Sequence, residues 1–146
     1  MKIEDITTEW AADTELLNDP TEISRSLLSI PKLHHKYYRY FLNEKLVHMK
    51  YVAEYNILKV EKHEFFIQGP SKETEALGWK YPASGKVLKS DINIYMEGDR
   101  QIIDATLKAG MQNAKVDYIK SILENLKYRG HDLKAALDDI KFKNGS

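Results

Sequence analysis

The chain has 146 residues, enough for one domain with a core, and its four prolines, seven glycines and 30% of charged residues are typical of a helix-rich protein. It contains no cysteine, which excludes a disulfide framework and a thiolate metal site and fits a reducing compartment. No apolar run approaches the roughly 20 residues of a membrane-spanning helix, and the acidic N-terminus does not resemble a signal peptide. We therefore expect a cytoplasmic protein with no membrane partner.

Charge is unevenly distributed although the net charge is zero. Residues 1–30 carry two basic and seven acidic side chains, residues 31–89 carry eleven and six, and residues 90–146 carry nine of each. We expect a single helical domain, 1–146, with acidic N-terminal helices in 1–30, a long basic helix and loop in 31–98, and a C-terminal helix in 99–146.

Two short helices are predicted at the start of the chain. The first is indicated by apolar residues at helical spacing, Ile3, Ile6 and Trp10. In the second, Asp19 suits the N-cap, Pro20 the first helical position, and Glu22 the third position of a capping box. This helix is expected to end just before Pro31, because proline disfavours a helical conformation in the residue that precedes it.

A long helix is predicted from Lys32 to about Ile67, where neither glycine nor proline interrupts the chain and Gln68-Gly69-Pro70 forms the stop. One apolar stripe comprises Leu42, Leu46, Met49, Ala53, Ile57, Val60 and Ile67. A second comprises Tyr40, Val47, Tyr51, Leu58 and Phe65. Two stripes on one helix imply two sets of neighbours, and we expect some of these neighbours to come from other chains.

The segment 70–89 is predicted to be a loop or a short extended piece, since it holds two prolines, two glycines and no clear period. Residues 91–96 alternate as in a short strand. Asp99 then suits the N-cap of a helix that begins at Arg100.

The C-terminal helix carries two copies of one apolar pattern. Each residue of the second copy lies two heptads after its counterpart in the first. The residues are Ile119, Ile122, Leu123 and Leu126, then Leu133, Ala136, Leu137 and Ile140. Because the second group stays in phase with the first, we expect one helix that continues through Gly130, where a mid-helix glycine costs only about 1 kcal/mol. So narrow and regular a stripe suits helix–helix assembly, and we predict these eight residues as a subunit interface.

The predicted fold is therefore mainly all-α. It is a long antiparallel helical hairpin with short N-terminal helices and a basic connecting loop, and it assembles through its C-terminal helix.

Motifs that would indicate catalysis or cofactor binding are absent. The sequence has no phosphate-binding loop, no dinucleotide fingerprint and no H-E-x-x-H zinc motif. His34 and His35 are adjacent, so on a helix they point about 100° apart and make a poor metal chelate. We expect neither an enzyme nor a bound cofactor or metal.

One group of residues does indicate a function. It is a basic flank of the long helix, followed by a basic loop. We predict seven of its residues as nucleic-acid contacts: Lys45, Lys59, Lys62, His63, Lys72, Lys86 and Lys89. They are interleaved with the rings of Phe66, Trp79 and Tyr81, and single-stranded nucleic acid is bound by such charges and flat rings. In the alternative interpretation, the lysines only keep the helix soluble and the rings belong to the core.

The order and spacing of several motifs resemble the UvsY family, the recombination mediators of T-even-type bacteriophages. "DPTEI" at Asp19 resembles an early segment of the family, "LKVEKHEFF" at Leu58 its basic "LKARLDYY"-like motif, and "GKVLKSD" at Gly85 its "KTVLSAD"-like segment. The C-terminal stretch resembles the end of the family in the acidic cap Asp99, in Arg129-Gly130-His131, in Leu133-Lys134, and in Phe142 with Gly145.

This resemblance implies a ring-like homo-oligomer of about six or seven subunits that binds single-stranded DNA. It implies a role in loading a RecA-like recombinase onto DNA covered by a single-strand-binding protein. The family's basic motif places DNA contact on Lys59 and, across a one-residue gap, on Lys62, although Val60-Glu61 departs from the motif. The rival hypothesis is a helical scaffold or adaptor protein without affinity for nucleic acid.

Overall fold

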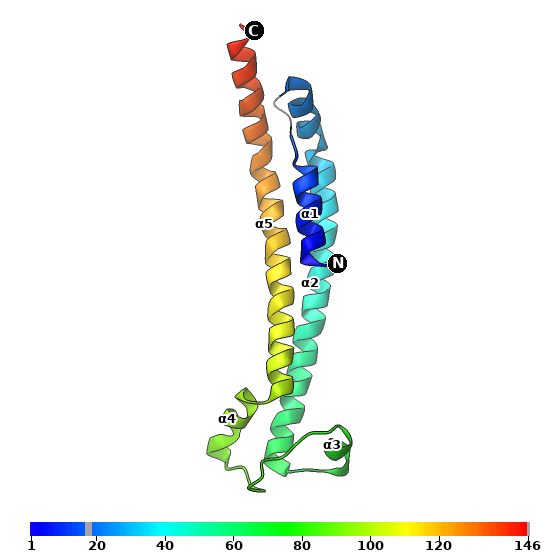
Figure 1. Cartoon of the computed structure of the whole chain (residues 1–146), viewed down its shortest axis with the longest axis vertical. Coiled ribbons are helices and arrows are strands. Elements are labelled where there is room, and N and C mark those ends of the chain that lie inside the picture. The colour runs from blue at the N-terminus through cyan, green and yellow to red at the C-terminus, as the bar shows by residue number, and fades with distance from the viewer. Residues whose placement is uncertain (17–18, 146) are drawn as a thin grey trace. The chain divides into compact units, whose positions relative to one another are not determined.

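The computed structural model describes residues 1–16 and 19–145, and all regular elements among these residues are helices, with no strand (Figure 1). The elements are α1 (Ile3–Asp13), α2 (Pro20–Gln68), α3 (Lys72–Ala76), a 3₁₀ turn (Lys89–Asp91), α4 (Ile92–Glu97) and α5 (Arg100–Lys143). They form two compact units: unit 1 consists of the described residues in 1–46 and 113–146, and unit 2 of residues 47–112. Within each unit, the α2 and α5 segments run in opposite directions, so the mainly all-α hairpin prediction is confirmed.

Unit 1 is a layer of three helices around one small core. The buried residues of this core are Ile6 from α1, Tyr37 from α2, and Ile119, Ile122 and Leu126 from α5. Full burial of an aliphatic side chain of this size contributes about 1.5–3 kcal/mol. The predicted first helix is therefore confirmed, and it serves to cover the α2–α5 pair of this unit.

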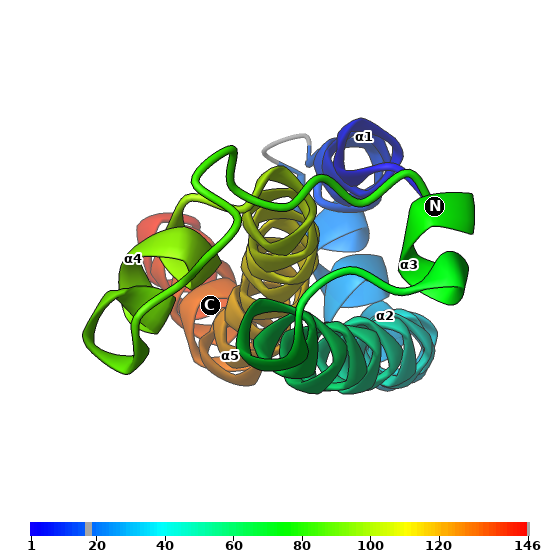
Figure 2. The same ribbon diagram turned by 90° about the horizontal axis from the view of Figure 1, so that it is seen from below.

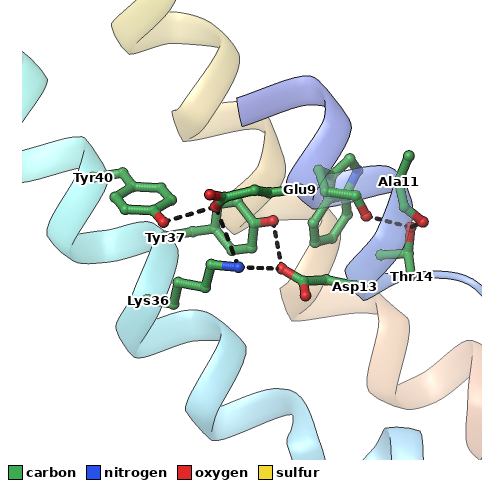
Figure 3. A network of polar contacts seen from close by, with 8 residues as sticks. Glu9, Ala11, Asp13, Thr14, Lys36, Tyr37 and Tyr40 are labelled. Atoms are coloured by element: carbon green, nitrogen blue, oxygen red, sulfur yellow. Dashed lines mark hydrogen bonds and ion pairs between the residues drawn. The ribbon is translucent and has the colours of Figure 1, made fainter. Parts of the chain in front are cut away.

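A polar network fastens α1 to α2 within unit 1 (Figure 3). The Tyr37 hydroxyl and the Lys36 ammonium each donate to Asp13 Oδ2 at 2.7 Å, and the Tyr40 hydroxyl donates to Glu9 Oε2 at 2.7 Å. Burial and the hydrogen bond to Asp13 raise the pKa of Tyr37, and the hydrogen bond to Glu9 with some burial raises the pKa of Tyr40. Burial lowers the pKa of Lys36, but the two carboxylates more than compensate and leave it above the ordinary value.

Unit 2 has a core of its own, formed by α2, α4 and α5 with the connecting loop. Phe65 and Phe66 from α2, Ile92 and Met96 from α4, and Ile102 from α5 are its buried residues. The small helices α3 and α4 lie on opposite sides of the α2–α5 pair of this unit (Figure 2). The α2–α5 pair of unit 2 therefore has a small helix on each of two sides and is not enclosed on all sides.

Helix α2 does not end before Pro31, so that prediction is wrong. It is continuous from Pro20 to Gln68, with Asp19 Oδ1 accepting from the Thr21 amide at its start. A proline inside a helix costs about 3 kcal/mol, because it leaves a carbonyl without its N–H donor. Ile23 and Tyr37, on either side of Pro31, are both buried, and a continuous helix is what keeps both inside unit 1.

The strand expected at residues 91–96 is also wrong, since Ile92–Glu97 form α4. The period-two pattern of Ile92, Ile94 and Met96 places residues four apart on one face as well, as a helix requires. Ile92 and Met96 are buried, whereas Ile94 is 67% exposed. No other described segment offers a partner strand, and a lone strand cannot satisfy its backbone. The loop expectation for 70–89 needs a smaller correction, since Ser71 caps the short helix α3.

Helix α5 runs from Arg100 to Lys143 and continues through Gly130, as predicted. One row of its buried and partly buried positions recurs at alternating spacings of three and four residues, and Lys115, Tyr118, Ile122 and Arg129 lie beside it. The row consists of Ile102, Ala105, Ala109, Gln112, Val116, Ile119, Leu123, Leu126, Gly130, Leu133, Leu137 and Ile140. A Cβ atom at Gly130 would lie 3.6 Å from Cδ1 of Ile30, so the close neighbour of this glycine is α2 of the same chain.

Candidate nucleic-acid interface

Unit 2 contains an open groove of about 780 Å³ beside the basic flank of α2. Its walls are Tyr55, Asn56, Lys59, Val60, His63 and Glu64 from α2, Asn93, Met96 and Glu97 from α4, and Ile102 from α5. The groove exists because α4 packs on α2 through Met96 and through the ring contact between Phe66 and Tyr95, whose centroids are 5.9 Å apart.

Two of the predicted DNA contacts, Lys59 and His63, meet in this groove. They are four residues apart on α2 and both are exposed, as neighbours on one helix face should be. Among residues 1–16 and 19–145, no carboxylate forms an ion pair with Lys59, so its ammonium is available to a phosphate. Glu64 and Glu97 also line the groove, so its charge is mixed and not uniformly basic.

The α4 side of the groove could not be identified from the sequence. Asn93 and Glu97 lie more than thirty residues from Lys59, and no motif connects them to it. The alternation of the segment that carries them predicts a strand. Once the segment is recognised as a helix, the burial of Met96 orients Asn93 and Glu97 toward the groove.

The structure places Lys62 inside unit 2 and not on the predicted DNA-contacting surface. Its side chain is 4% exposed, its ammonium lies 3.1 Å from Asp99 Oδ2, and it also lies 4.0 Å from the ring centroid of Trp79. A buried charge has to be paired, and Asp99 supplies that pair. Asp99 also accepts from the Ile102 amide at 3.1 Å, which confirms it as a cap of α5. Lys62 thus fixes the start of α5 to α2.

The three predicted loop contacts, Lys72, Lys86 and Lys89, are exposed. The rings expected between them are not free. Trp79 and Tyr81 each pack edge-on against Phe65 at 5.5 Å, and the Tyr81 hydroxyl donates to the Phe66 carbonyl at 3.2 Å. For these aromatic residues, the alternative interpretation as core is the one that the structure supports.

Lys45, the remaining predicted contact, belongs to unit 1 and adjoins a row of rings on α2. Its ammonium lies 5.4 Å from the centroid of Phe41, which stacks on Tyr38 at 6.0 Å, and Tyr38 stacks on His34 at 5.8 Å. Tyr38 is 44% exposed. Here, exposed rings and a cation do occur side by side, as single-stranded nucleic acid requires.

The residues predicted as a subunit interface lie mostly inside unit 1. Ile119, Ile122, Leu126 and Leu133 are buried, Leu123, Leu137 and Ile140 are half-buried, and Ala136 is exposed. Contacts with α1 and α2 of the same chain thus account for the burial of this stripe without a second subunit.

The described part of the chain shows neither a metal-binding cluster nor a membrane-spanning helix. No group of three or more histidine, aspartate or glutamate side chains is placed to hold a metal ion in residues 1–16 and 19–145. None of the described helices has the length and apolar content needed to span a bilayer.

Comparison with known proteins gives one family. Residues 9–146 match the model of a family described as "Recombination, repair and ssDNA binding protein UvsY". No curated protein sequence matches the chain.

Two crystal structures of the bacteriophage T4 recombination mediator protein UvsY are similar to the chain. The first, of lattice type IV, has a TM-score of 0.76 and 15% identity, and the match covers 98% of this chain and 99% of that one. The second, of lattice type II, has a TM-score of 0.78 and 17% identity, with 99% and 98% covered. At these identities the likeness establishes the fold.

Proposed function

The chain belongs to the UvsY family, and from this premise we propose that it is a recombination mediator that binds single-stranded DNA. It helps to load a RecA-like recombinase onto DNA covered by a single-strand-binding protein. It catalyses no reaction itself, needs no cofactor, and acts in the cytoplasm of the host cell. The family match over residues 9–146 supports the role in recombination, and the groove of unit 2 supports a place for the DNA.

The observation that carries the proposal is the position of Lys59. This residue matches the basic motif of the family, lies in the groove of unit 2, and is exposed without an ion-pair partner among the described carboxylates. In this setting, Lys59 provides a phosphate contact, while Tyr55 and the amides of Asn56 and Asn93 face the sugar and base edges. The exposed Lys72, Lys86 and Lys89 of the loop supply additional phosphate contacts.

The row of rings beside Lys45 is the second surface for the strand. Tyr38 and Phe41 offer ring surface for stacking, and base–aromatic stacking is worth about 1–3 kcal/mol per base. The contribution is largely independent of sequence, because every base has a flat face. A mediator that acts on any coated strand requires binding that does not depend on the base sequence.

Assembly converts these modest sites into a strong one. A homo-oligomeric ring of about six or seven subunits repeats the groove, so that one strand binds many sites at a high effective concentration. Binding of this kind depends steeply on salt, because each neutralised phosphate releases counterions. A strand held in this way is presented in a fixed shape, which lowers the cost of exchanging the coat protein for the recombinase.

The substitution Lys59→Ala tests this assignment. We expect affinity for a labelled single-stranded oligonucleotide to fall about tenfold at low salt. We also expect the slope of log K against log salt to become shallower by about 0.7 for each phosphate that is no longer neutralised. Fluorescence anisotropy titrations at several salt concentrations measure both quantities. Lys134→Ala, at an exposed lysine of α5 in unit 1, is the matched control and should leave both unchanged.

An unchanged affinity and salt slope for Lys59→Ala would refute the role of the groove. A wild-type protein that ignores the oligonucleotide at low salt would instead support the alternative function, a helical scaffold or adaptor without nucleic-acid affinity. The packing of Trp79 and Tyr81 in the core of unit 2 is the observation that favours this alternative.

A further inference from the structure

Lys62 is buried, whereas the other lysines predicted to contact DNA are exposed. Its ammonium lies 3.1 Å from Asp99 Oδ2, 4.0 Å from the centroid of the Trp79 ring and 5.8 Å from that of Phe65. A DNA phosphate can reach this ammonium only if these contacts break. Any effect of Lys62 on DNA binding in the folded protein therefore has to pass through the residues that it touches.

The contact with Asp99 fixes one wall of the groove. Asp99 lies between α4 and α5, and its amide donates to the Met96 carbonyl at 3.3 Å. Its carboxylate accepts from the Ile102 amide through Oδ1 at 3.1 Å, while Oδ2 is paired with Lys62. Met96 and Ile102 both line the groove. Lys62 therefore holds the residue that joins these two parts of the wall.

The contact with Trp79 fixes the basic loop. The Trp79 amide donates to the Thr74 carbonyl at 3.0 Å, which ties this residue to α3, the helix that begins with Lys72. The ring packs edge-on against Phe65 at 5.5 Å and carries the Lys62 ammonium 4.0 Å from its centroid. A cation and an aromatic ring attract each other more strongly when they are removed from water. Lys62 therefore helps to set where the loop packs on α2.

We propose that Lys62 is a positioning residue for DNA binding. It makes no contact with the strand, and it holds the groove wall through Asp99 and the basic loop through Trp79. This inference rests on the proposed function and deepens it, because it assigns different tasks to the two basic positions of the family motif. Lys59 binds a phosphate, and Lys62 keeps in place the elements that carry the remaining contacts.

The charges of the pair make this arrangement sensitive to a single substitution. Without Lys62, the carboxylate of Asp99, which is only 13% exposed, has lost its partner, and an uncompensated buried charge is strongly unfavourable. The carboxylate then turns toward water and displaces the connection between α4 and α5, and the Trp79 ring loses its cation. If both charges are removed together, no such strain arises, because a neutral pair of similar volume can replace a buried ion pair.

Two variants of the full chain distinguish positioning from contact. Lys62→Met removes the cation and keeps a long side chain whose thioether can pack on the Trp79 ring. Lys62→Met with Asp99→Asn removes both charges, and asparagine can still cap α5. The reference chain and both variants also carry Trp10→Phe, so that Trp79 is the only tryptophan. Quenching of its fluorescence by acrylamide then reports the packing of the loop in the absence of DNA.

Affinity and salt slope for a labelled single-stranded oligonucleotide are measured well below the melting temperature, so that a loss of stability alone does not change them. Lys62→Met should make Trp79 more accessible to acrylamide, lower the affinity about tenfold and make the salt slope shallower, because the loop lysines are displaced. The double variant should restore the shielding of Trp79, the affinity to within about twofold and the full salt slope, although it has one lysine fewer.

Lys36→Met is the matched control, since it removes a lysine that is paired with Glu9 and Asp13 in unit 1. It should leave the quenching of Trp79, the affinity and the salt slope unchanged. A loss of affinity in this control equal to that of Lys62→Met would show that any broken ion pair weakens binding, and the proposal would be wrong.

Three further outcomes would contradict the proposal. In the first, the double variant shields Trp79 again but binds as weakly as Lys62→Met, with a salt slope shallower by about 0.7, which means that the ammonium itself neutralises a phosphate. In the second, Lys62→Met exposes Trp79 but binds DNA like the reference chain. In the third, Lys62→Met leaves Trp79 shielded.

The design also covers two ways in which the measurement could fail. If Lys62→Met does not fold, the salt slope of the double variant decides between positioning and contact by itself. A reference chain that ignores the oligonucleotide refutes the proposed function, and the quenching of Trp79 still shows whether Lys62 holds the loop.

Discussion

At the residue scale, neighbouring lysines of one motif have different roles. Lys59 is exposed in the groove, whereas Lys62, one turn further along α2, is 4% exposed and paired with Asp99. Helical geometry separates them, because Lys62 lies on the side that packs on α5 and Lys59 lies nearer the edge. The sequence predicts two cations at helical spacing but not which of them finds a carboxylate inside the fold.

The network around Tyr37 leads to a prediction about pH. Folding raises the pKa of Tyr37 and Tyr40 above the ordinary value of 10.0, and that of Lys36 above 10.5. The folded state then holds these protons more tightly than the unfolded chain, so the stabilisation is complete below about pH 10 and declines as pH rises further. Tyr37→Phe should lower the free energy of unfolding by about 1–2 kcal/mol at neutral pH, because it removes a hydrogen bond to a charged group.

Urea denaturation at neutral pH and at a series of values above pH 10 measures this effect. The decline at alkaline pH should be shallower in Tyr37→Phe than in the wild type. Tyr128→Phe, at a tyrosine that is 61% exposed, is the control and should change stability by less than about 0.5 kcal/mol. Equal alkaline slopes for wild type and Tyr37→Phe would show that the phenol does not titrate with folding.

At the element scale, tertiary packing overrides two local signals. Pro31 should end a helix and does not, because Ile23 and Tyr37 are both buried on the same continuous α2. Gly130 should weaken a helix, yet α5 continues through it with its inner seam in phase. In both cases a long packed surface outweighs a local cost of about 1–3 kcal/mol.

Gly130→Ala should stabilise the protein by about 0.5–1 kcal/mol. The backbone there is helical, so alanine gains helix propensity, and the new Cβ atom makes an ordinary contact of 3.6 Å with Ile30. Thermal and urea unfolding measure the change. A loss of stability greater than about 1 kcal/mol would mean that α2 and α5 of unit 1 cannot accommodate a methyl group at this seam position.

At the scale of the whole molecule, each unit has a core of its own. In unit 1, α1 contributes Ile6 and the carboxylates that hold Lys36, Tyr37 and Tyr40. In unit 2, the elements are held together by the buried ion pair of Lys62 with Asp99 and by the aromatic cluster around Phe65. Within unit 1, Lys36 of α2 forms ion pairs with Glu9 and Asp13 of the acidic N-terminal helix, so part of the opposite charge of the two segments is paired inside this unit.

Deletion of residues 1–13 should therefore weaken unit 1 selectively. The loss of Ile6, of the packing of Trp10 and of the polar network should cost about 3–5 kcal/mol. Hydrogen exchange measured by mass spectrometry should show faster exchange in 20–46 and 113–143, with the aromatic cluster of unit 2 little changed. Thr8→Ala, on the exposed side of α1, should leave the exchange pattern intact. A uniform acceleration over all residues would show that the two units unfold together.

The sequence by itself determined the helical class, a helix start at Asp19 and a helix stop at Gly69 (although not the continuous α2 between them), the cap of α5 at Asp99, and the continuity of α5 at Gly130. These features follow from caps, glycines and a periodicity that are local or repeat regularly along one helix. It also identified two apolar stripes on α2, of which Tyr51, Leu58 and Phe65 face inward and Met49, Ile57 and Val60 face outward.

Only the tertiary structure decided which neighbour covers each stripe. The stripe of α5 from Ile119 to Leu126 packs against α1 and α2 of the same chain, and Trp79 and Tyr81 pack edge-on against Phe65. Periodicity reveals that a side chain will be buried, but burial is a property of two surfaces, and the second surface lies far away in the sequence. The same reason separates Lys62 from Lys59: the difference between a buried ion pair and an available cation depends on Asp99, 37 positions further along the chain.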